Sequence, residues 1–182
     1  ALGEKGKAVI IPHDAPQALR NMAKGTEIIQ VKSDPAEVMA AMLGRSAHDG
    51  RVAMQYLLHF DGIQAAARIV DFLAGRKLRL SQLLKRLPAM NYKAIAVPCQ
   101  WTEKGRVLRQ LVAQQNKRKL ELYEGVKIWD DRGWALVLPD SEKPRFNIYA
   151  QGHSEEFAEE LAAEFSDRVN SLLHSGSLDE KS

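Results

Sequence analysis

Two short apolar runs on either side of a proline-bounded polar loop constrain the fold of this chain more than any other segment. Residues 134–138 read Trp-Ala-Leu-Val-Leu, residues 145–149 read Arg-Phe-Asn-Ile-Tyr, and the loop between them runs from Pro139 to Pro144. Strand-like runs separated by a short turn-forming segment are typical of a β-hairpin. We therefore predict two antiparallel strands whose connecting loop carries charged side chains.

This hairpin resembles the phosphate-binding hairpin in the C-terminal domain of the α-D-phosphohexomutases, the phosphoglucomutase and phosphomannomutase family. In that family the first strand reads G-W-V-L-V-R, the loop reads P-S-G-T-E-P, and the second strand contains R-x-Y. The positions that keep this frame are Gly133, Trp134, Leu136, Val137, Pro139, Pro144 and Tyr149. The resemblance implies that the chain keeps the scaffold of the hairpin.

The residues that hold the sugar phosphate in the family are replaced here. Leu138 and Asn147 stand where the family has arginines, and residues 140–142 read Asp-Ser-Glu instead of Ser-Gly-Thr. Two guanidinium groups that would bind a phosphate through paired hydrogen bonds are thus replaced, and two carboxylates stand beside the site. Because a carboxylate repels a phosphate, most strongly where water is excluded, we expect the family's phosphate-binding mode to be absent or weak.

Three polar residues of the loop remain candidates for binding a phosphate in a different way. They are Ser141, Lys143 and Arg145. A hydroxyl, an ammonium and a guanidinium group that lie close together can hold an anion. A charged loop tip is also the ordinary solvated end of a hairpin, so both interpretations stay open.

The first half of the chain alternates strand and helix signals. We predict strands at residues 8–11 and 27–31 and helices at residues 15–24 and 35–43. Acidic residues followed three positions later by Gln or Glu indicate helix starts, as in a capping box. These pairs are Asp14 with Gln17, Asp34 with Glu37, and Asp61 with Gln64, and the glycines predicted to end helices are Gly25, Gly44 and Gly75. The alternation favours an α/β domain built from βαβ units.

The remainder of this half predicts a third strand, a third helix and a boundary. The strand is expected near residues 52–58, and a short helix at residues 80–87 ends at Pro88. The third helix places four apolar residues on one stripe: Ala66, Ile69, Val70 and Leu73. Such a stripe predicts that the helix lies against the sheet formed by the preceding strands. Residues 88–91, Pro-Ala-Met-Asn, read as a domain boundary.

The second half has a different order of elements. It predicts a strand at residues 93–97, a helix at 103–114, strands within 120–128, 134–138 and 145–149, and a long final helix that begins at Ser154. The apolar residues of the final helix recur at steps of three or four: Phe157, Leu161, Phe165, Val169 and Leu172. Strands grouped between helices indicate an α+β domain.

The resemblance to the phosphohexomutases extends over nearly the whole chain. Their third domain is a small βαβαβ layer, and their fourth is an antiparallel sheet with helices on one face. The resemblance implies that residues 7–88 form an α/β domain of βαβαβα order like domain III, and residues 91–174 an α+β domain like domain IV. Residues 175–182 are polar and are expected to form a flexible tail.

The family's other functional motifs are altered in this chain or belong to other domains. A Gly-Gly-Glu-x-Ser-Gly-His loop holds the sugar hydroxyls in the family, and the corresponding residues 51–60 lack the paired glycines and the glutamate. The phosphoserine and the Asp-rich magnesium loop lie in the family's first two domains. The chain contains no Asp-x-Asp-x-Asp run. We therefore predict no catalytic residue, metal site or cofactor here, and expect magnesium only in upstream domains.

Composition narrows the class of protein. A length of 182 residues, 45% apolar content and a formal charge of +3 indicate a globular protein without the charge clusters of nucleic-acid binders. The single cysteine, Cys99, is interpreted as a buried side chain in a reducing compartment. No apolar run is long enough for a membrane span and the start of the chain does not resemble a signal peptide, so we expect a cytoplasmic protein without membrane association.

The histidines and a stretch of lysine and arginine residues provide weaker candidates for a metal, catalytic or nucleic-acid-binding site. The histidines, which lack the spacing of zinc ligands and are interpreted as surface or capping residues, are His13, His48, His59, His153 and His174. Ser46 near His48 and Asp49 lacks the setting of a catalytic nucleophile. The densest basic stretch comprises Lys104, Arg106, Arg109, Lys117, Arg118 and Lys119. We interpret it as the solvent-exposed face of a packed helix, with nucleic-acid binding as a minor alternative.

Two functional hypotheses follow from the sequence. The first is a degenerate, non-catalytic C-terminal module of a phosphohexomutase-like protein with a structural or regulatory role, fused to a nucleotidyltransferase of the mannose-1-phosphate guanylyltransferase kind. The alternative is the substrate-binding half of an active mutase that binds a hexose phosphate through Ser141, Lys143 and Arg145. In both, the expected partners are upstream domains of the same polypeptide and, at most weakly, a hexose phosphate.

Overall fold

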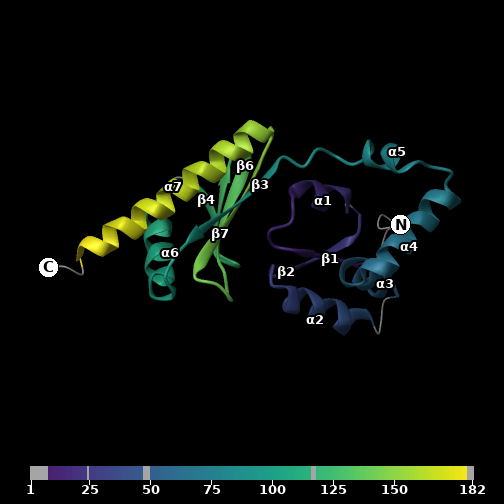
Figure 1. The fold of residues 1–182 in the computed structure, drawn as a ribbon, viewed down its shortest axis with the longest axis horizontal. Helices are drawn as coiled ribbons and strands as arrows, with labels where there is room; N and C mark the ends of the chain where they lie inside the picture. Colours follow the sequence, from purple (N-terminus) through teal and green to yellow (C-terminus); the bar gives the residue numbers. More distant parts are fainter. Residues whose placement is uncertain (1–7, 24, 47–49, 116–117, 180–182) are drawn as a thin grey trace. The chain divides into compact units, whose positions relative to one another are not determined.

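The protein divides into two compact units between Ala89 and Met90. The computed structural model describes residues 8–23, 25–46, 50–115 and 118–179. Figure 1 shows the order of the elements along the chain. Each unit has its own sheet and its own buried clusters.

The first unit contains a small parallel sheet with helices on both of its faces. Strands β1 (Ala8–Pro12) and β2 (Glu27–Val31) pair in parallel, and α1 (Gln17–Met22) connects them, as the predicted βαβ unit requires. The helices that follow are α2 (Pro35–Ser46), α3 (Gly50–Phe60), α4 (Gly62–Gly75) and α5 (Leu80–Leu84). Because alternate strand residues face opposite sides, Val9 and Ile11 pack with Ala15 and Ala23, whereas Ile10 packs with residues of α2 and α3.

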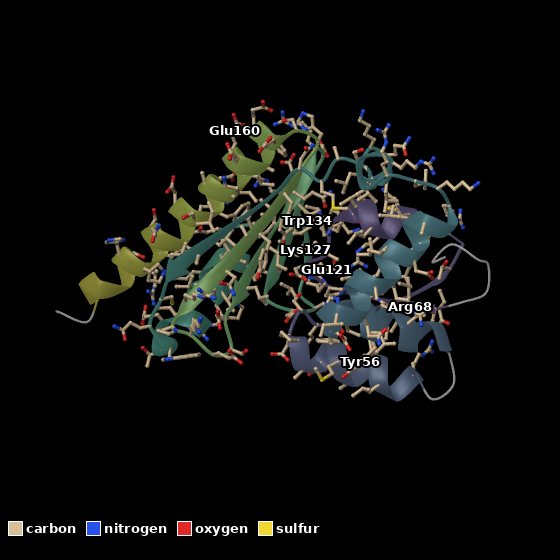
Figure 2. All side chains as sticks on the ribbon, turned by 45° about the vertical axis from the view of Figure 1, so that its right-hand side comes forward. Tyr56, Arg68, Glu121, Lys127, Trp134 and Glu160 are labelled. Atoms are coloured by element: carbon tan, nitrogen blue, oxygen red, sulfur yellow. The ribbon has the colours of Figure 1, made fainter. Side chains whose placement is uncertain are left out.

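The strand predicted near residues 52–58 is wrong, because these residues lie in helix α3. Residues 53–60 contain no β-branched side chain and are rich in helix formers such as Met, Gln and Leu. Tyr56, which is labelled in Figure 2, and Phe60 lie one helical turn apart and pack against the cluster of Ile10, Val38 and Met42. This cluster gives the helix a buried face.

Helix α3 also supplies hydrogen-bond partners for the backbone of β1 at the edge where a third strand was predicted. The side chain of Gln55 accepts a hydrogen bond from the Ile10 backbone N–H (3.0 Å) and donates one to the Ile10 carbonyl oxygen (2.5 Å). An edge strand exposes such groups to pairing with another chain. The Gln55 amide therefore satisfies the outer edge of β1 where a third strand would otherwise pair.

Helix α4 does not lie against a sheet, contrary to the prediction. It packs against α3, and none of its described residues is buried. In the part of the chain that the structure describes, the first sheet has only β1 and β2. One face of this narrow sheet packs against α2 and α3 and the other against Ala15 and Ala23, which flank α1, so the apolar stripe of α4 has no sheet to cover.

Two of the three predicted helix starts are confirmed. Asp34 accepts hydrogen bonds from the backbone N–H groups of Ala36 and Glu37, and Asp61 accepts them from Ile63 and Gln64. The start at Asp14 is wrong, because α1 begins at Gln17 with Pro16 as its N-cap and without a side-chain cap. Pro16 has a φ of −55° and a ψ of 141°, the non-helical conformation typical of an N-cap residue.

Helix α4 ends at Gly75, as predicted, and α1 ends shortly before Gly25. Gly25, shortly after α1, has a φ of 88°, the left-handed conformation that glycine favours. Gly44 lies within α2, which continues to Ser46. After α4 the left-handed residue is Lys77 (φ 52°) rather than Gly75, because the helix includes Gly75 as its last residue.

The second unit is an antiparallel sheet with two helices on one face, as predicted. Its elements are β3 (Tyr92–Pro98), the 3₁₀ turn η1 (Trp101–Glu103), α6 (Lys104–Ala113), β4 (Lys119–Glu121), β5 (Val126–Asp130), β6 (Gly133–Pro139), β7 (Arg145–Gly152) and α7 (Glu155–Asp179). Within the described ranges the sheet has five strands in the order β3-β7-β6-β5-β4. Figure 1 shows α6 and α7 along the same side of this sheet.

The core of the second unit lies between the sheet and these two helices. The buried strand residues Val137, Phe146 and Ile148 belong to one cluster with Val107 and Leu111 of α6. Helix α7 contributes all of the apolar residues predicted for it: Phe157, Leu161, Phe165, Val169 and Leu172. Ser154 accepts a hydrogen bond from the Phe157 backbone N–H and caps this helix, as predicted.

Helix α7 is longer than the sequence indicated. It ends at Asp179, so residues 175–179, which were expected to belong to a flexible tail, are helical. Residues 180–182 lie outside the described residues. The polar composition of this segment suggested that the helix would end earlier, but its one glycine, Gly176, costs a helix only about 1 kcal/mol and does not end it.

The opposite face of the sheet carries a second apolar cluster. Trp134, Leu136 and Leu138 form it with Tyr92 and Tyr149. The indole N–H of Trp134 donates to the side chain of Gln151 (2.9 Å), and the ammonium of Lys127 lies 3.9 Å from the centre of the Trp134 ring (Figure 2). Trp134, a frame position of the hairpin, is thus a buried structural residue.

Candidate anion site in the β6–β7 hairpin

The hairpin that carries the candidate residues is held in the middle of the second sheet. Strand β6 pairs with β5 on one side and with β7 on the other, from Gly133 opposite Gly152 to Pro139 opposite Phe146. A side chain at Gly133 would collide with the Gln151 carbonyl oxygen, so the close approach of the two strands requires glycine there. The loop of residues 140–144 is therefore positioned by two paired strands.

The carboxylate of Asp140 is the centre of this loop. Its Oδ1 accepts hydrogen bonds from the backbone N–H groups of Glu142 (2.9 Å) and Lys143 (3.0 Å). Its Oδ2 accepts from the Arg145 guanidinium Nε (2.7 Å) and the Asn147 side-chain amide (3.2 Å). The two oxygens of one carboxylate thus engage two loop amides, a guanidinium and a side-chain amide.

The electrostatics of the loop favour the charged form of this carboxylate. The hydrogen bond from the Glu142 backbone and the one from Arg145 are the main reasons why the pKa of Asp140 lies far below its usual range. Only 12% of the Asp140 side chain is exposed, against 37% of the Arg145 side chain. Asp140 therefore stays ionised at any physiological pH.

Lys104 closes the loop from the side of helix α6. Its ammonium donates to the carbonyl oxygens of Asp140 (2.6 Å) and Lys143 (2.7 Å), and it lies 3.5 Å from the centre of the Trp101 ring. The residue is buried. Its hydrogen bonds join the two ends of the loop tip, so Lys104 fixes the shape of the loop without touching the Asp140 carboxylate.

The candidate residues named from sequence lie in different settings. Ser141 and Lys143 are exposed at the loop tip, and Lys143 contributes its backbone N–H and carbonyl to the loop. Arg145 points to the centre of the loop but is paired with Asp140. The structure therefore engages Arg145 internally and leaves Ser141 and Lys143 at the surface.

Sequence reasoning did not identify the roles of three residues in this site. Asp140 was seen as a repelling charge, Asn147 as a lost arginine, and Lys104 as part of an exposed helix face. The last interpretation is wrong, because Lys104 is buried. Its spacing from Val107 and Leu111, three and seven residues later, would have placed it on the inward face of the helix.

Of the other described residues in the basic stretch, two arginines form ion pairs, Arg109 is exposed on α6, and Lys119 is exposed in β4. Arg106 pairs with Glu103, and Arg118 pairs with Glu164 (3.1 Å) and Asp130 (3.6 Å). Arg118 therefore connects the sheet to α7. Lys117, which was part of the predicted stretch, lies outside the described residues.

The segment that the sequence analysis compared with the family's sugar-hydroxyl loop is helical. The residues that correspond to the sugar-hydroxyl loop, 51–60, lie within helix α3, where Gln55 binds the backbone of β1.

The histidines that the structure describes form no metal site. His13 is completely buried, contrary to its interpretation as a surface residue, and its Nδ1 lies 2.7 Å from the Gln30 side-chain nitrogen. His48 lies outside the described residues. No cluster of His, Cys, Asp and Glu among the described residues could hold a metal ion.

The cysteine is a buried side chain, as predicted. Burial raises the pKa of the Cys99 thiol, which disfavours the reactive thiolate. Across the described part of the chain, no helix has the length and apolar character needed to cross a membrane.

Comparison with known proteins gives the same family as the hairpin motif. No family model matches the chain. A probable phosphoglucosamine mutase of Methanopyrus kandleri is 28% identical over 92% of this chain and 40% of its own length. A probable phosphoglucosamine mutase of Methanosarcina barkeri is 25% identical over 89% of this chain and 39% of its own length. A phosphoglucomutase/phosphomannomutase of Thermococcus kodakarensis is 26% identical over 87% of this chain and 37% of its own length.

A solved structure shows the same fold. The crystal structure of a phosphoglucomutase/phosphomannomutase family protein from Burkholderia thailandensis matches with a TM-score of 0.70 over 92% of this chain and 38% of its own, at 16% identity. The chain is therefore phosphohexomutase-like over most of its length. It spans about 40% of the length of the curated relatives that it matches.

Proposed function

We propose that this chain is a degenerate C-terminal module of a phosphohexomutase-like protein of sugar-phosphate and nucleotide-sugar metabolism. It is non-catalytic by itself and has a structural or regulatory role beside the upstream domains of its polypeptide. A fusion to a nucleotidyltransferase of the mannose-1-phosphate guanylyltransferase kind is the context we favour. The observation that carries the proposal is the Asp140 carboxylate, which occupies the donors that a phosphate would need.

A hexose phosphate would have to compete with this carboxylate. It would gain hydrogen bonds of the same kind, because the donors of Glu142, Lys143, Arg145 and Asn147 are the same. A free ligand also loses translational and rotational freedom when it binds, which costs at least about 4 kcal/mol and which a tethered side chain does not lose. A difference of about 4 kcal/mol corresponds to roughly a thousandfold in affinity. The loop therefore favours its own carboxylate.

The chemistry of phosphoryl transfer supports a non-catalytic role. That reaction requires a positioned phosphoryl carrier and positive charge that neutralises the transferred group. In the proposed arrangement both are supplied by other domains, and magnesium belongs there as well. The guanidinium of Arg145, which could otherwise neutralise a phosphate, forms an ion pair with Asp140.

The similarity to mutases favours one alternative. The relatives named above are called mutases, and they match along 87% to 92% of this chain. In the alternative, the chain is the substrate-binding half of an active phosphomannomutase or phosphoglucomutase, and Ser141, Lys143 and Arg145 hold the hexose phosphate. This binding requires Asp140 to leave the loop so that Arg145 is released.

Titration of the ¹⁵N-labelled chain distinguishes the two proposals. Glucose 1-phosphate, mannose 1-phosphate, glucose 6-phosphate and glucosamine 6-phosphate are added separately, with sodium sulfate at equal ionic strength as the control. The proposal predicts no saturable shift of the Glu142 and Lys143 amide signals up to roughly 10 mM ligand. A saturable shift with any hexose phosphate, larger than with sulfate, would establish the alternative.

A further inference from the structure

The donors around Asp140 have the arrangement of an oxyanion site. Two consecutive backbone N–H groups, those of Glu142 and Lys143, point at one oxygen, and the Arg145 guanidinium and the Asn147 amide point at the other. Successive backbone amides that converge on one point form an anion-binding concavity, and a guanidinium group adds a charge-assisted bond. Carboxylates and phosphates are the anions that such donors bind.

We propose that the β6–β7 loop is a self-liganded oxyanion site: the Asp140 carboxylate is its resident ligand, and a free phosphate or carboxylate binds there once that carboxylate is removed. This inference rests on the proposed function, because it explains why the wild-type loop does not take a hexose phosphate. It adds that the binding site is retained and filled, rather than lost.

The loop keeps its shape without the Asp140 carboxylate, because other contacts hold it. Lys104 binds the carbonyl oxygens of Asp140 and Lys143, which are backbone groups. The backbone N–H of Asp140 donates to the Arg145 carbonyl (3.1 Å), and that of Arg145 donates to the Lys143 carbonyl (2.8 Å). The Cys99 backbone N–H donates to the Pro144 carbonyl (2.9 Å). None of these hydrogen bonds uses the Asp140 side chain.

The Asp140 carboxylate is covalently attached to the loop that binds it, and this explains why free anions do not bind to the wild-type site. A group attached close to its binding site has an effective concentration in the millimolar range or above. Acid does not open the site under physiological conditions, because the pKa of Asp140 is far below its usual range. Shortening the side chain removes the resident ligand and leaves its donors in place.

The test compares two variants that remove one negative charge each from the same loop. Asp140→Ala empties the site, whereas Glu142→Ala removes a carboxylate from an exposed residue and leaves the Asp140 carboxylate in place. Inorganic phosphate, glucose 1-phosphate and acetate are titrated separately into each full-length ¹⁵N-labelled variant and the wild type, with sodium chloride at equal ionic strength as the control. The backbone amide signals of positions 142 and 143 are followed, and Tm is measured in the same buffers.

The proposal predicts a response in Asp140→Ala only. Saturable amide shifts and a rise in Tm are expected with phosphate, glucose 1-phosphate or acetate, at concentrations of roughly 1–10 mM, but not with chloride. If Asp140→Ala is unfolded in chloride, the same anions are expected to restore its dispersed spectrum. A response to inorganic phosphate and to the ester alike assigns the site to the phosphate group, and a response to the ester alone assigns it to a phosphate monoester.

Two results would overturn the inference. One is an Asp140→Ala chain that responds to none of these anions up to roughly 50 mM, whether folded or unfolded. The other is an equal response of Glu142→Ala, which would assign the effect to net charge. If the wild type shows no response to these anions, either result leaves the proposed function intact. Binding of a hexose phosphate to the amides of residues 142 and 143 in the wild type would instead contradict the proposed function itself.

Discussion

At the scale of single residues, the Asp140 carboxylate, which we expected to repel a phosphate, accepts hydrogen bonds from four donors of the loop. The sequence suggested the repulsion, because Asp140 stands where the family has a serine. The hydrogen bonds to Asp140 depend on the turn of the loop, which places the Lys143 backbone N–H and the Arg145 guanidinium beside the Asp140 carboxylate. Sequence patterns do not specify hydrogen bonds across such a loop, so this part of the site required coordinates.

The contribution of Asp140 to stability depends on pH. Its pKa is lower in the folded chain than in the unfolded chain, where an aspartate titrates near 3.9. The charged group therefore stabilises the fold above about pH 4, and this stabilisation is lost as the pH falls toward the folded-state pKa. We expect the Tm of wild type to exceed that of Asp140→Asn at about pH 7 and the difference to shrink below about pH 4. A difference in Tm that is equal at about pH 3 and pH 7 would contradict this.

Lys104 is predicted to be the main side chain that holds the loop tip. Lys104→Met removes two charge-assisted hydrogen bonds and leaves two carbonyl groups without their donor. We expect a loss of about 2 kcal/mol in the free energy of unfolding, measured by urea denaturation. Lys143→Met, at an exposed side chain of the same loop, is the control and is expected to change stability by less than about 0.5 kcal/mol. Equal effects would show that Lys104 has no special role.

At the scale of elements, local signals predicted most of the helices and strands. Strand β2 has the predicted bounds, and the caps at Asp34 and Asp61 form as expected because each needs only neighbouring backbone groups. The strand predicted near residues 52–58 is wrong, because these residues form a helix that packs Tyr56 and Phe60 against β1 and α2. Tertiary packing against β1 and α2 therefore contributes to the helical conformation of this segment.

The edge of β1 provides a test at this scale. Gln55→Leu removes both hydrogen bonds to Ile10 and leaves the backbone groups of a partly buried strand unsatisfied. We expect it to lower the free energy of unfolding by about 1–3 kcal/mol and to increase aggregation, because the strand edge becomes open to pairing. Gln64→Leu, at an exposed position of α4, is the control and is expected to be nearly neutral. A neutral effect of Gln55→Leu would refute the role of Gln55 as an edge cap.

At the scale of the whole molecule, the chain divides into two compact units between Ala89 and Met90. The sequence did not indicate how little of the first unit is buried, because its apolar stripe on α4 looked like a core face. That stripe would have required a wider sheet than β1 and β2 form.

Limited proteolysis tests this organisation. Helix α5 has no buried residue, and Lys85 and Arg86 follow it in an exposed segment. Exposed segments with few packing contacts are cleaved first. Trypsin is therefore expected to cut first at Lys85 or Arg86, and mass spectrometry should detect two fragments that divide near residue 86. First cleavage within the strands of the second unit would contradict the division described here.

We propose that Asp140, and not a sugar phosphate, is the ligand of the β6–β7 loop, and a crystal of the wild-type chain soaked in glucose 1-phosphate tests this proposal most directly. We expect the Asp140 carboxylate to remain within hydrogen-bonding distance of Arg145 and of the Glu142 and Lys143 amides, with no ester in the loop. A phosphate group bound to those amides, with Asp140 turned away into solvent, would contradict it.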